Sequence, residues 1–246
     1  MNAKRPLIAV LTGAGISTDS GIPDYRGPQG LWQKDPSAER LVTIGPYRDD
    51  PQVRERAWRM RVETGALGAE PNAGHRALVD LERSGLPLRV LTQNIDGLHQ
   101  KAGLSPRKVL ELHGNVRETQ CLRCRVVGSM AETLARVEAG EPDPDCRECG
   151  GILKPRIVMF GENLDPVVLD QADAIARACD LFIAIGTSLQ VFPVAALPYN
   201  AVKSGAKLII LNAEPTPYDE AATEVIREPI STALPKLVRR LVLERA

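Results

Sequence analysis

The 246-residue sequence lacks any long hydrophobic run. The apolar stretch nearest the N-terminus covers only residues 7–11, which is shorter than the apolar region of a signal peptide. No stretch approaches the roughly 20 apolar residues that a membrane-spanning helix needs. We therefore expect a cytoplasmic protein that has no membrane partner.

The sequence also lacks an excess of charge, since 31 Lys and Arg residues balance 31 Asp and Glu residues. No partner of strong opposite charge is implied. Between residues 117 and 149, where the cysteines gather, acidic residues outnumber arginines. A nucleic-acid-binding ribbon would be basic, so no nucleic-acid partner is expected.

Cysteine is scarce, but four of the five cysteines form two Cys-x-x-Cys pairs, Cys121/Cys124 and Cys146/Cys149. Two such turns can point four thiolates at one centre, which is typical of structural zinc. Two disulfides would need an oxidising compartment, of which the sequence gives no sign. Because a four-thiolate cage leaves no open position for substrate, we expect the chemistry elsewhere. Cys179 is expected to be buried.

Short apolar runs alternate with amphipathic stretches of helical length, which predicts an α/β fold. Nearly continuous apolar strands separated by helices indicate an open, Rossmann-like parallel sheet with helices on both faces. The predicted strands are residues 7–11, 88–91, 109–112, 157–160, 181–185 and 208–211, and the predicted helices are residues 72–83, 166–178, 195–203 and 233–243.

Two segments interrupt this alternation, one from residue 31 to about 85 and one that carries the paired cysteines. We expect them to pack together as a smaller domain and to leave a cleft beside the sheet. The predicted small domain comprises residues 31–85 and 117–153, and the large domain comprises residues 1–30, 86–116 and 154–246.

Polar or glycine-rich turns follow nearly every predicted strand, where an open α/β sheet binds its ligands. The turn Gly13-Ala14-Gly15 would let backbone amides approach a pyrophosphate. Thr18 stands where the full dinucleotide fingerprint has its third glycine, so a plain tight turn remains the alternative. A second such turn is residues 186–188, and Glu214 could accept hydrogen bonds from ribose hydroxyls.

A loop that follows the first turn carries Asp24, Tyr25, Arg26 and Trp32. Its arginine could meet a phosphate and its aromatic residues could cover a ring. The alternative is a surface loop with an ordinary ion pair.

Only three histidines are present, and His113 is the candidate general base because it follows a strand and precedes a glycine. His75 and His99 lie in helical surroundings and are expected to be structural. Asn94 and Asp96 could reach the same pocket from the turn after the second strand. Their alternative role is to cap the following helix.

These segments together resemble the sirtuin family of NAD-dependent protein lysine deacylases. The resemblance implies a Rossmann-like large domain and a small domain built from a helical insertion and a zinc ribbon. It rests on the paired cysteines and on GAGISTDSGIPDYRG (13–27), TQNIDGLHQKAG (92–103), ELHGN (111–115), KPRIVMFGE (154–162), GTSLQVFP (186–193) and LNAEPT (211–216).

The resemblance implies NAD as co-substrate, bound along the strand ends, with Arg26 near the pyrophosphate and Asp96 on the carboxamide. The residues implied to bind NAD are Gly13, Ala14, Gly15, Asp24, Tyr25, Arg26, Trp32, Gln93, Asn94, Ile95, Asp96, Gly186, Thr187, Ser188, Asn212, Ala213, Glu214 and Ile230.

In this family the acyl oxygen of a modified lysine attacks the ribose carbon as nicotinamide leaves, so His113, Asn94 and Asp96 are implied to be catalytic. The products are free lysine, nicotinamide and O-acyl-ADP-ribose. The partner is an acyl-lysine protein, held as an added strand. The residues implied to lie beside it are Val158, Met159, Phe160, Gly161, Leu189, Gln190 and Val191.

The sequence departs from the family pattern at a few positions. Tyr25 is often Phe, and Met159 replaces a commoner aromatic residue. Family members that remove succinyl or malonyl groups carry a Tyr-x-x-Arg pair, where this chain has Trp58 and Arg61. Arg61 is a candidate contact for an acidic acyl group, and the alternative is a packed tryptophan beside a solvated arginine.

Deacetylation is the expected activity. The alternatives are desuccinylation or demalonylation and mono-ADP-ribosyl transfer on the same scaffold. A binding protein without catalysis is disfavoured because His113, Asn94 and Asp96 are all present. The oligomeric state stays open, and a monomer is compatible with the sequence.

Overall fold

The computed structural model describes residues 6–23, 36–64 and 68–244. Its larger sheet has six parallel strands in the order β3-β2-β1-β7-β8-β9, which confirms the predicted open parallel sheet. The strands are β1 (Ile8–Thr12), β2 (Leu88–Thr92), β3 (Val109–Glu111), β7 (Leu181–Ile185), β8 (Lys207–Leu211) and β9 (Glu224–Ile226).

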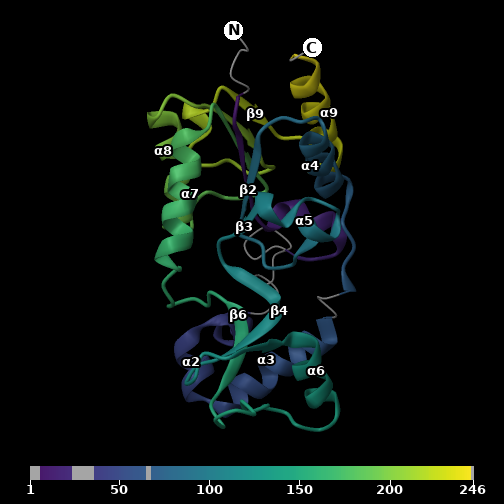
Figure 1. The fold of residues 1–246 in the computed structure, drawn as a ribbon, viewed down its shortest axis with the longest axis vertical. Helices are drawn as coiled ribbons and strands as arrows, with labels where there is room; N and C mark the ends of the chain where they lie inside the picture. The colour runs from purple at the N-terminus through teal and green to yellow at the C-terminus, as the bar shows by residue number, and fades with distance from the viewer. Residues whose placement is uncertain (1–5, 24–35, 65–67, 245–246) are drawn as a thin grey trace.

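Helices cover both faces of this sheet (Figure 1). On one face, α4 (Ala73–Arg83) and α9 (Ile230–Leu243) pack on alternate strand residues such as Val10. On the other face, α7 (Pro166–Ala178) and α8 (Leu197–Lys203) pack on the intervening ones such as Leu11. Because residues of the central strands β1, β2, β7 and β8 are mostly buried on one face or the other, these strands read as nearly continuous apolar runs.

A smaller antiparallel sheet lies beyond the carboxyl ends of the parallel strands (Figure 1). Its strand order is β5-β4-β6, with β5 (Val127–Ser129), β4 (Gly114–Cys121) and β6 (Leu153–Ile157). The accompanying helices are α2 (Ile44–Asp49), α3 (Pro51–Thr64) and α6 (Met130–Glu138). Short helical turns connect the elements elsewhere: η1 (Ala14–Ser20), η2 (Pro36–Val42), α5 (Leu98–Lys101), η4 (Pro106–Lys108), η5 (Val194–Ala196) and η6 (Asp219–Ala221).

The predicted strand at residues 157–160 was wrong in its bounds and its sheet. The strand ends at Ile157, and it pairs antiparallel with β4 rather than joining the parallel sheet. Phe160 instead forms an isolated bridge with Thr43. This segment is apolar because it contacts the small sheet and the cleft. The length of an apolar run does not reveal which sheet it contacts.

Residues of the two interruptions of the α/β pattern contact each other. Trp58 of α3 lies in one apolar cluster with Cys121 and Cys146. Arg54 of α3 pairs with Asp143 at 2.7 Å. Helix α4 packs instead in the core of the large sheet. The domain boundaries given above stay a prediction.

Among the helices formed by residues 6–23, 36–64 and 68–244, none is long and apolar enough to cross a membrane.

Candidate active site and metal centre

A cleft lies at the carboxyl ends of β1 and β2, where the two sheets meet. Residues from the large sheet and from the end of β6 face each other across it. The described residues that line it are Ala14, Ser17, Ile22, Pro23, Val42, Gln93, Asn94, Ile95, Asp96, His113, Ile157, Val158 and Phe160.

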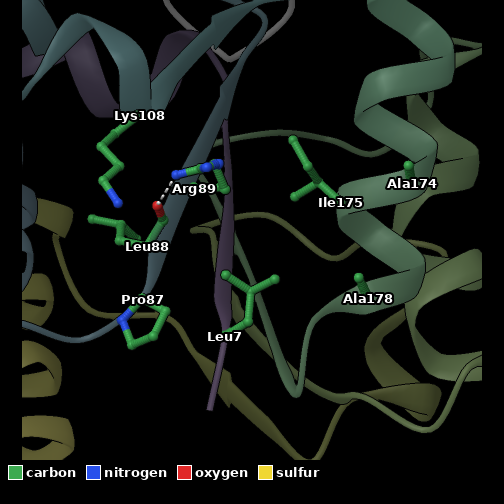
Figure 2. Close-up of a pocket in the computed structure, with 8 residues that line it drawn as sticks. All are labelled: Leu7, Pro87, Leu88, Arg89, Lys108, Ala174, Ile175 and Ala178. Atoms are coloured by element: carbon green, nitrogen blue, oxygen red, sulfur yellow. Dashed lines mark hydrogen bonds between the residues drawn. The ribbon is translucent and has the colours of Figure 1, made fainter. Parts of the chain in front are cut away.

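A larger hollow of about 400 Å³ lies at the opposite, amino ends of the same strands (Figure 2). Its walls are mainly aliphatic, with Arg89 and Lys108 as the charged side chains among the residues that line it. Arg89 donates a hydrogen bond to the carbonyl of Leu88. Among the described residues that line this hollow there is no histidine, thiol or carboxylate, so the smaller cleft is the candidate active site.

His113 lies half-buried in the cleft, two residues after the end of β3. Its Nδ1 lies 3.0 Å from the carbonyl oxygen of Gln93. A carbonyl can only accept, so Nδ1 carries the hydrogen and the Nε2 lone pair is left available as a base. Burial lowers the pKa of His113, and the hydrogen bond to Gln93 opposes that shift in part.

Asn94 and Asp96 meet Ser17, which the sequence analysis did not single out. The Ser17 hydroxyl donates to Asp96 Oδ2 at 2.7 Å and accepts from Asn94 Nδ2 at 3.1 Å. Asn94 Nδ2 also donates to the carbonyl of Gly13 at 3.1 Å. The first glycine turn and the turn after β2 are thereby held together.

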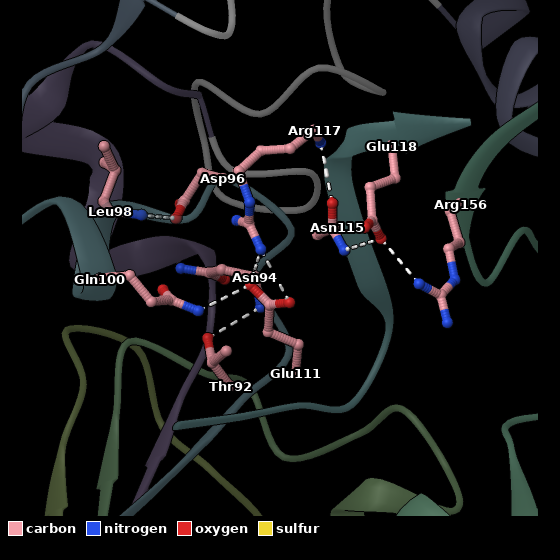
Figure 3. Close-up of polar contacts among 10 residues, drawn as sticks. All are labelled: Thr92, Asn94, Asp96, Leu98, Gln100, Glu111, Asn115, Arg117, Glu118 and Arg156. Carbon is pink, nitrogen blue, oxygen red and sulfur yellow. Dashed lines mark hydrogen bonds and ion pairs between the residues drawn. The ribbon is translucent and has the colours of Figure 1, made fainter. Parts of the chain in front are cut away.

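Asp96 also accepts the backbone amide of Leu98 at 2.9 Å, and the amide of Asn94 donates to Thr92 Oγ1 (Figure 3). Asp96 therefore bonds to the first residue of α5 as well as lining the cleft.

His75 and His99 lie behind this turn, with ring centroids 5.1 Å apart. His75 Nε2 lies 3.4 Å from Ser17 Oγ, and His99 Nε2 lies 2.9 Å from Thr12 Oγ1. Burial lowers the pKa of His75 to about 4 and that of His99 to about 3. Both rings are therefore neutral at pH 7, and they support the turn without adding charge.

The two glycine turns lie against each other. The Gly15 amide donates to the carbonyl of Gly186 at 2.9 Å. A Cβ added at Gly13 would lie 2.6 Å from the Gly186 oxygen, and one added at Gly186, whose φ is +59°, would lie 2.5 Å from the Ile16 nitrogen. Only glycine allows this approach.

The remaining predicted nucleotide contacts gather around these turns. Thr187 Oγ1 accepts from Gln93 Nε2 at 2.8 Å. Asn212 and Glu214 follow β8, and Arg227 bonds to both of their carbonyls. The structure thus brings the turns after β1, β2, β7 and β8 to one edge. Asp24, Tyr25, Arg26 and Trp32 lie outside the described residues.

The predicted substrate residues fall into three groups. Val158 and Phe160 line the cleft. Met159 and Leu189 are each 2% exposed, so their side chains pack into the protein. Gly161 and Gln190 are exposed, and Val191 is half-buried.

Arg61 is not among the residues that line the cleft in the part of the chain that the structure describes. Its Nη1 donates to the carbonyl of Ala57, and its guanidinium lies 5.6 Å from the ring centroid of Trp58. Trp58 itself is fully buried.

The outer side of the turn after β2 is supported by a polar cluster (Figure 3). Arg117 donates to both carboxylate oxygens of Glu111 at 2.8 and 3.0 Å, and Gln100 donates to the same carboxylate at 2.8 Å. A Cβ at Gly97, whose φ is +73°, would lie 2.3 Å from Arg117 Nη1. The left-handed φ of Gly97 favours glycine at this position, whereas the end of the Arg117 side chain could move aside.

The four paired cysteines form the candidate metal centre. Their sulfur atoms all lie within 4.8 Å of one another, and the Cys121–Cys149 and Cys124–Cys146 sulfur distances are 3.5 and 3.6 Å. Such distances exceed an S–S bond of about 2.05 Å. They suit the corners of a tetrahedron around zinc, whose Zn–S bonds are about 2.3 Å. The cage therefore fits one structural zinc ion, as predicted.

A model of the Sir2 family matches residues 13–193. The "NAD-dependent protein deacetylase 2" of Streptomyces coelicolor is 64% identical over 237 residues, covering 96% of this chain and 98% of the relative. The "NAD-dependent protein deacylase 2" of Archaeoglobus fulgidus is 44% identical over 242 residues, covering 97% and 92%.

Solved structures agree with these relatives. A Sir2 complex with a deacetylated p53 peptide and 3'-O-acetyl ADP-ribose matches with a TM-score of 0.86 at 39% identity, covering 98% of this chain and 94% of that one. A Sir2 structure bound to a propionylated peptide matches with a TM-score of 0.83 at 37% identity, with the same coverage. The match of sequence and fold over nearly the whole chain shows that this protein belongs to the Sir2 family.

Proposed function

We propose that this protein removes acyl groups from protein lysines with NAD as co-substrate, and that acetyl-lysine is its main substrate. The observation that carries the proposal is the cleft in which His113 faces the turn that holds Asn94 and Asp96. The Sir2 family catalyses NAD-dependent deacylation, and its solved members include complexes with acetylated and propionylated peptides.

The arrangement of turns supports NAD along the carboxyl edge of the sheet. The glycine turns at residues 13–15 and 186–188 would bind the phosphates and the adenosine half through backbone amides. Asn212 and Glu214 after β8, with Ile230 at the start of α9, would flank the adenosine. Asp96 and Asn94 would then lie at the nicotinamide and its ribose.

The chemistry needs one base and close positioning. As the bond between nicotinamide and the ribose C1′ breaks, the acyl oxygen forms a new bond to that carbon. His113 Nε2 takes the proton of a ribose hydroxyl, which then attacks the acyl carbon. The lysine amine then leaves with the proton that His113 returns, and water adds to the cyclic cation that remains. Cleavage of the bond from the acyl carbon to the C1′ oxygen leaves the acyl group on ADP-ribose as an ester. The protein supplies orientation and exclusion of solvent.

The lowered pKa of His113 gives a prediction for the pH profile. The base acts only when neutral, so activity falls as the pH drops through its pKa. Burial lowers this pKa, so the acid limb of kcat/KM is expected below the ordinary histidine value of about 6.5. The measurement is kcat/KM for an acetyl-lysine peptide across the acidic range at saturating NAD. A midpoint above the ordinary value would contradict the assignment.

The position of Arg61 gives a prediction for acyl preference. Because Arg61 bonds to Ala57 and stacks on Trp58, Arg61→Met is expected to leave the ranking of acyl groups unchanged. Mass spectrometry of acetyl, propionyl, succinyl and long-chain acyl-lysine peptides with NAD measures this ranking. Selective loss of succinyl removal in the variant would instead assign Arg61 to an acidic acyl group.

The same assay tests the function itself. Deacylation predicts nicotinamide release that depends on the peptide and matches the free lysine formed. Transfer of the ADP-ribose portion of NAD to protein without deacylation would favour mono-ADP-ribosyl transfer. The cytoplasmic location stays a prediction, and the oligomeric state stays open.

A further inference from the structure

Lys154 is a buried cation at the end of the cleft wall. The residue is 4% exposed. Its Nζ donates to the carbonyl of Ile157 at 2.5 Å and to Glu162 Oε2 at 2.8 Å, with a longer contact to the carbonyl of Pro155 at 3.4 Å. The ammonium group therefore bonds to Ile157, at the end of β6, and to Glu162, at the far end of the segment that follows.

Glu162 closes the other end of that segment. The oxygen that binds Lys154 also accepts the backbone amide of Met159 at 2.9 Å. The amide of Glu162 in turn donates to the carbonyl of Met159 at 2.9 Å. The ion pair and these two bonds fix the turn at residues 158–162, which we call the wall segment.

The wall segment is also tied to the active site. The Val158 amide donates to the carbonyl of His113 at 2.9 Å, and the Phe160 amide donates to the carbonyl of Val42 at 2.9 Å. Val158 and Phe160 line the cleft opposite the turn that carries Asp96. The wall segment therefore joins the catalytic histidine to the helical insertion.

We propose that Lys154 and Glu162 are positioning residues for the acyl-lysine peptide. The inference rests on the proposed function. A buried ion pair adds little stability over apolar residues of similar size, but the side chains of this one hold the carbonyl of Ile157, just before the wall segment, and the amide of Met159 within it. Neither side chain is among the described residues that line the cleft, so both act through the backbone of residues 157–162. The glycine turns that would bind NAD lie on the large sheet and do not depend on this pair.

The experiment compares Michaelis constants in Lys154→Met and Glu162→Gln. The KM for an acetyl-lysine peptide is expected to rise by about tenfold, within the roughly 10²-fold cost that a displacement of about 1 Å in a positioning group can have. The KM for NAD is expected to stay within about twofold of the wild-type value. Glu162→Gln preserves the size of the side chain, so it provides a folded variant should Lys154→Met not fold.

The ion pair of Arg54 and Asp143 provides a matched control. It lies in the small domain with similar burial and a distance of 2.7 Å, and it holds no backbone group of the wall segment. Asp143→Asn is expected to lower thermal stability but to leave the peptide KM unchanged.

Two results would overturn the inference. The first is an unchanged peptide KM in folded Glu162→Gln, and the second is an equal rise in the KM of both substrates, which would indicate a general loss of structure. Wild-type protein that turns over no acyl-lysine peptide would refute the proposed function itself, and this inference with it. Wild-type turnover with an unchanged variant would refute the inference alone.

Discussion

Replacement of His113 by alanine is expected to lower kcat for deacylation by a factor of about 10²–10⁴, the usual contribution of a positioned general base. The protein should stay folded, because His113 is half-buried, its imidazole bonds to the carbonyl of Gln93, and the backbone bond from Val158 to His113 does not depend on the side chain. The measurement is the rate at which free lysine forms from an acetyl-lysine peptide at saturating NAD.

His113→Asn removes the base but can keep the hydrogen bond to the carbonyl of Gln93. An asparagine amide can still donate to the Gln93 carbonyl, but it cannot take a proton near neutral pH. We therefore expect a loss similar to that in His113→Ala, with NAD affinity retained in both variants. Near wild-type turnover in either variant would contradict the assignment of the base.

Loss of one zinc thiolate is expected to have the largest effect on stability. Zinc binding in small structural sites contributes free energy directly to folding, so Cys121→Ala should lower the free energy of unfolding by more than about 4 kcal/mol, as loss of a metal can. Cys121 is also fully buried in the cluster with Trp58, so the variant leaves a cavity as well. Denaturant titration together with zinc content measures the effect.

Cys179→Ala is the matched control. Cys179 is buried in the core of the large sheet, and its thiol donates to the carbonyl of Ala176. This variant should keep its full zinc content and lose only the small amount of stability typical of a minor core truncation. A Cys121→Ala protein that lacks zinc, stays folded and yet fails in the chemical step would overturn the structural role of the metal.

The parallel sheet could be predicted because its strands are buried on both faces and each is followed by a polar turn. Strand β9 (Glu224–Ile226) was missed because it is short and only partly buried. Helix α9 begins at Ile230, before the predicted residue 233. Strand β6 was predicted at the wrong residues because Lys154 and Arg156 interrupt its apolar pattern. The apolar run that follows it looks more like a strand.

The site was predictable where its residues are polar and stand at strand ends, as do Asn94, Asp96 and His113. Ser17 was missed as a partner of Asp96 because a serine in a helical turn is common and its contact spans 79 residues of sequence. Lys154 and Glu162 stood in a quoted motif, but sequence alone does not show that a lysine is buried. Such roles depend on tertiary contacts.

Strand β4 begins one residue after His113 and ends at Cys121. A single residue inserted into or deleted from it would turn all later side chains to the opposite face and misdirect the first metal ligand. Its length is therefore fixed. The chain between the two cysteine pairs only has to bring the second pair back to the same metal centre. A Cβ added at Gly140, in this part of the chain, would have no atom within 4 Å, so insertions near Gly140 should be tolerated. We expect relatives to differ in length at residues 139–142 and to keep the spacing between the histidine and the first cysteine.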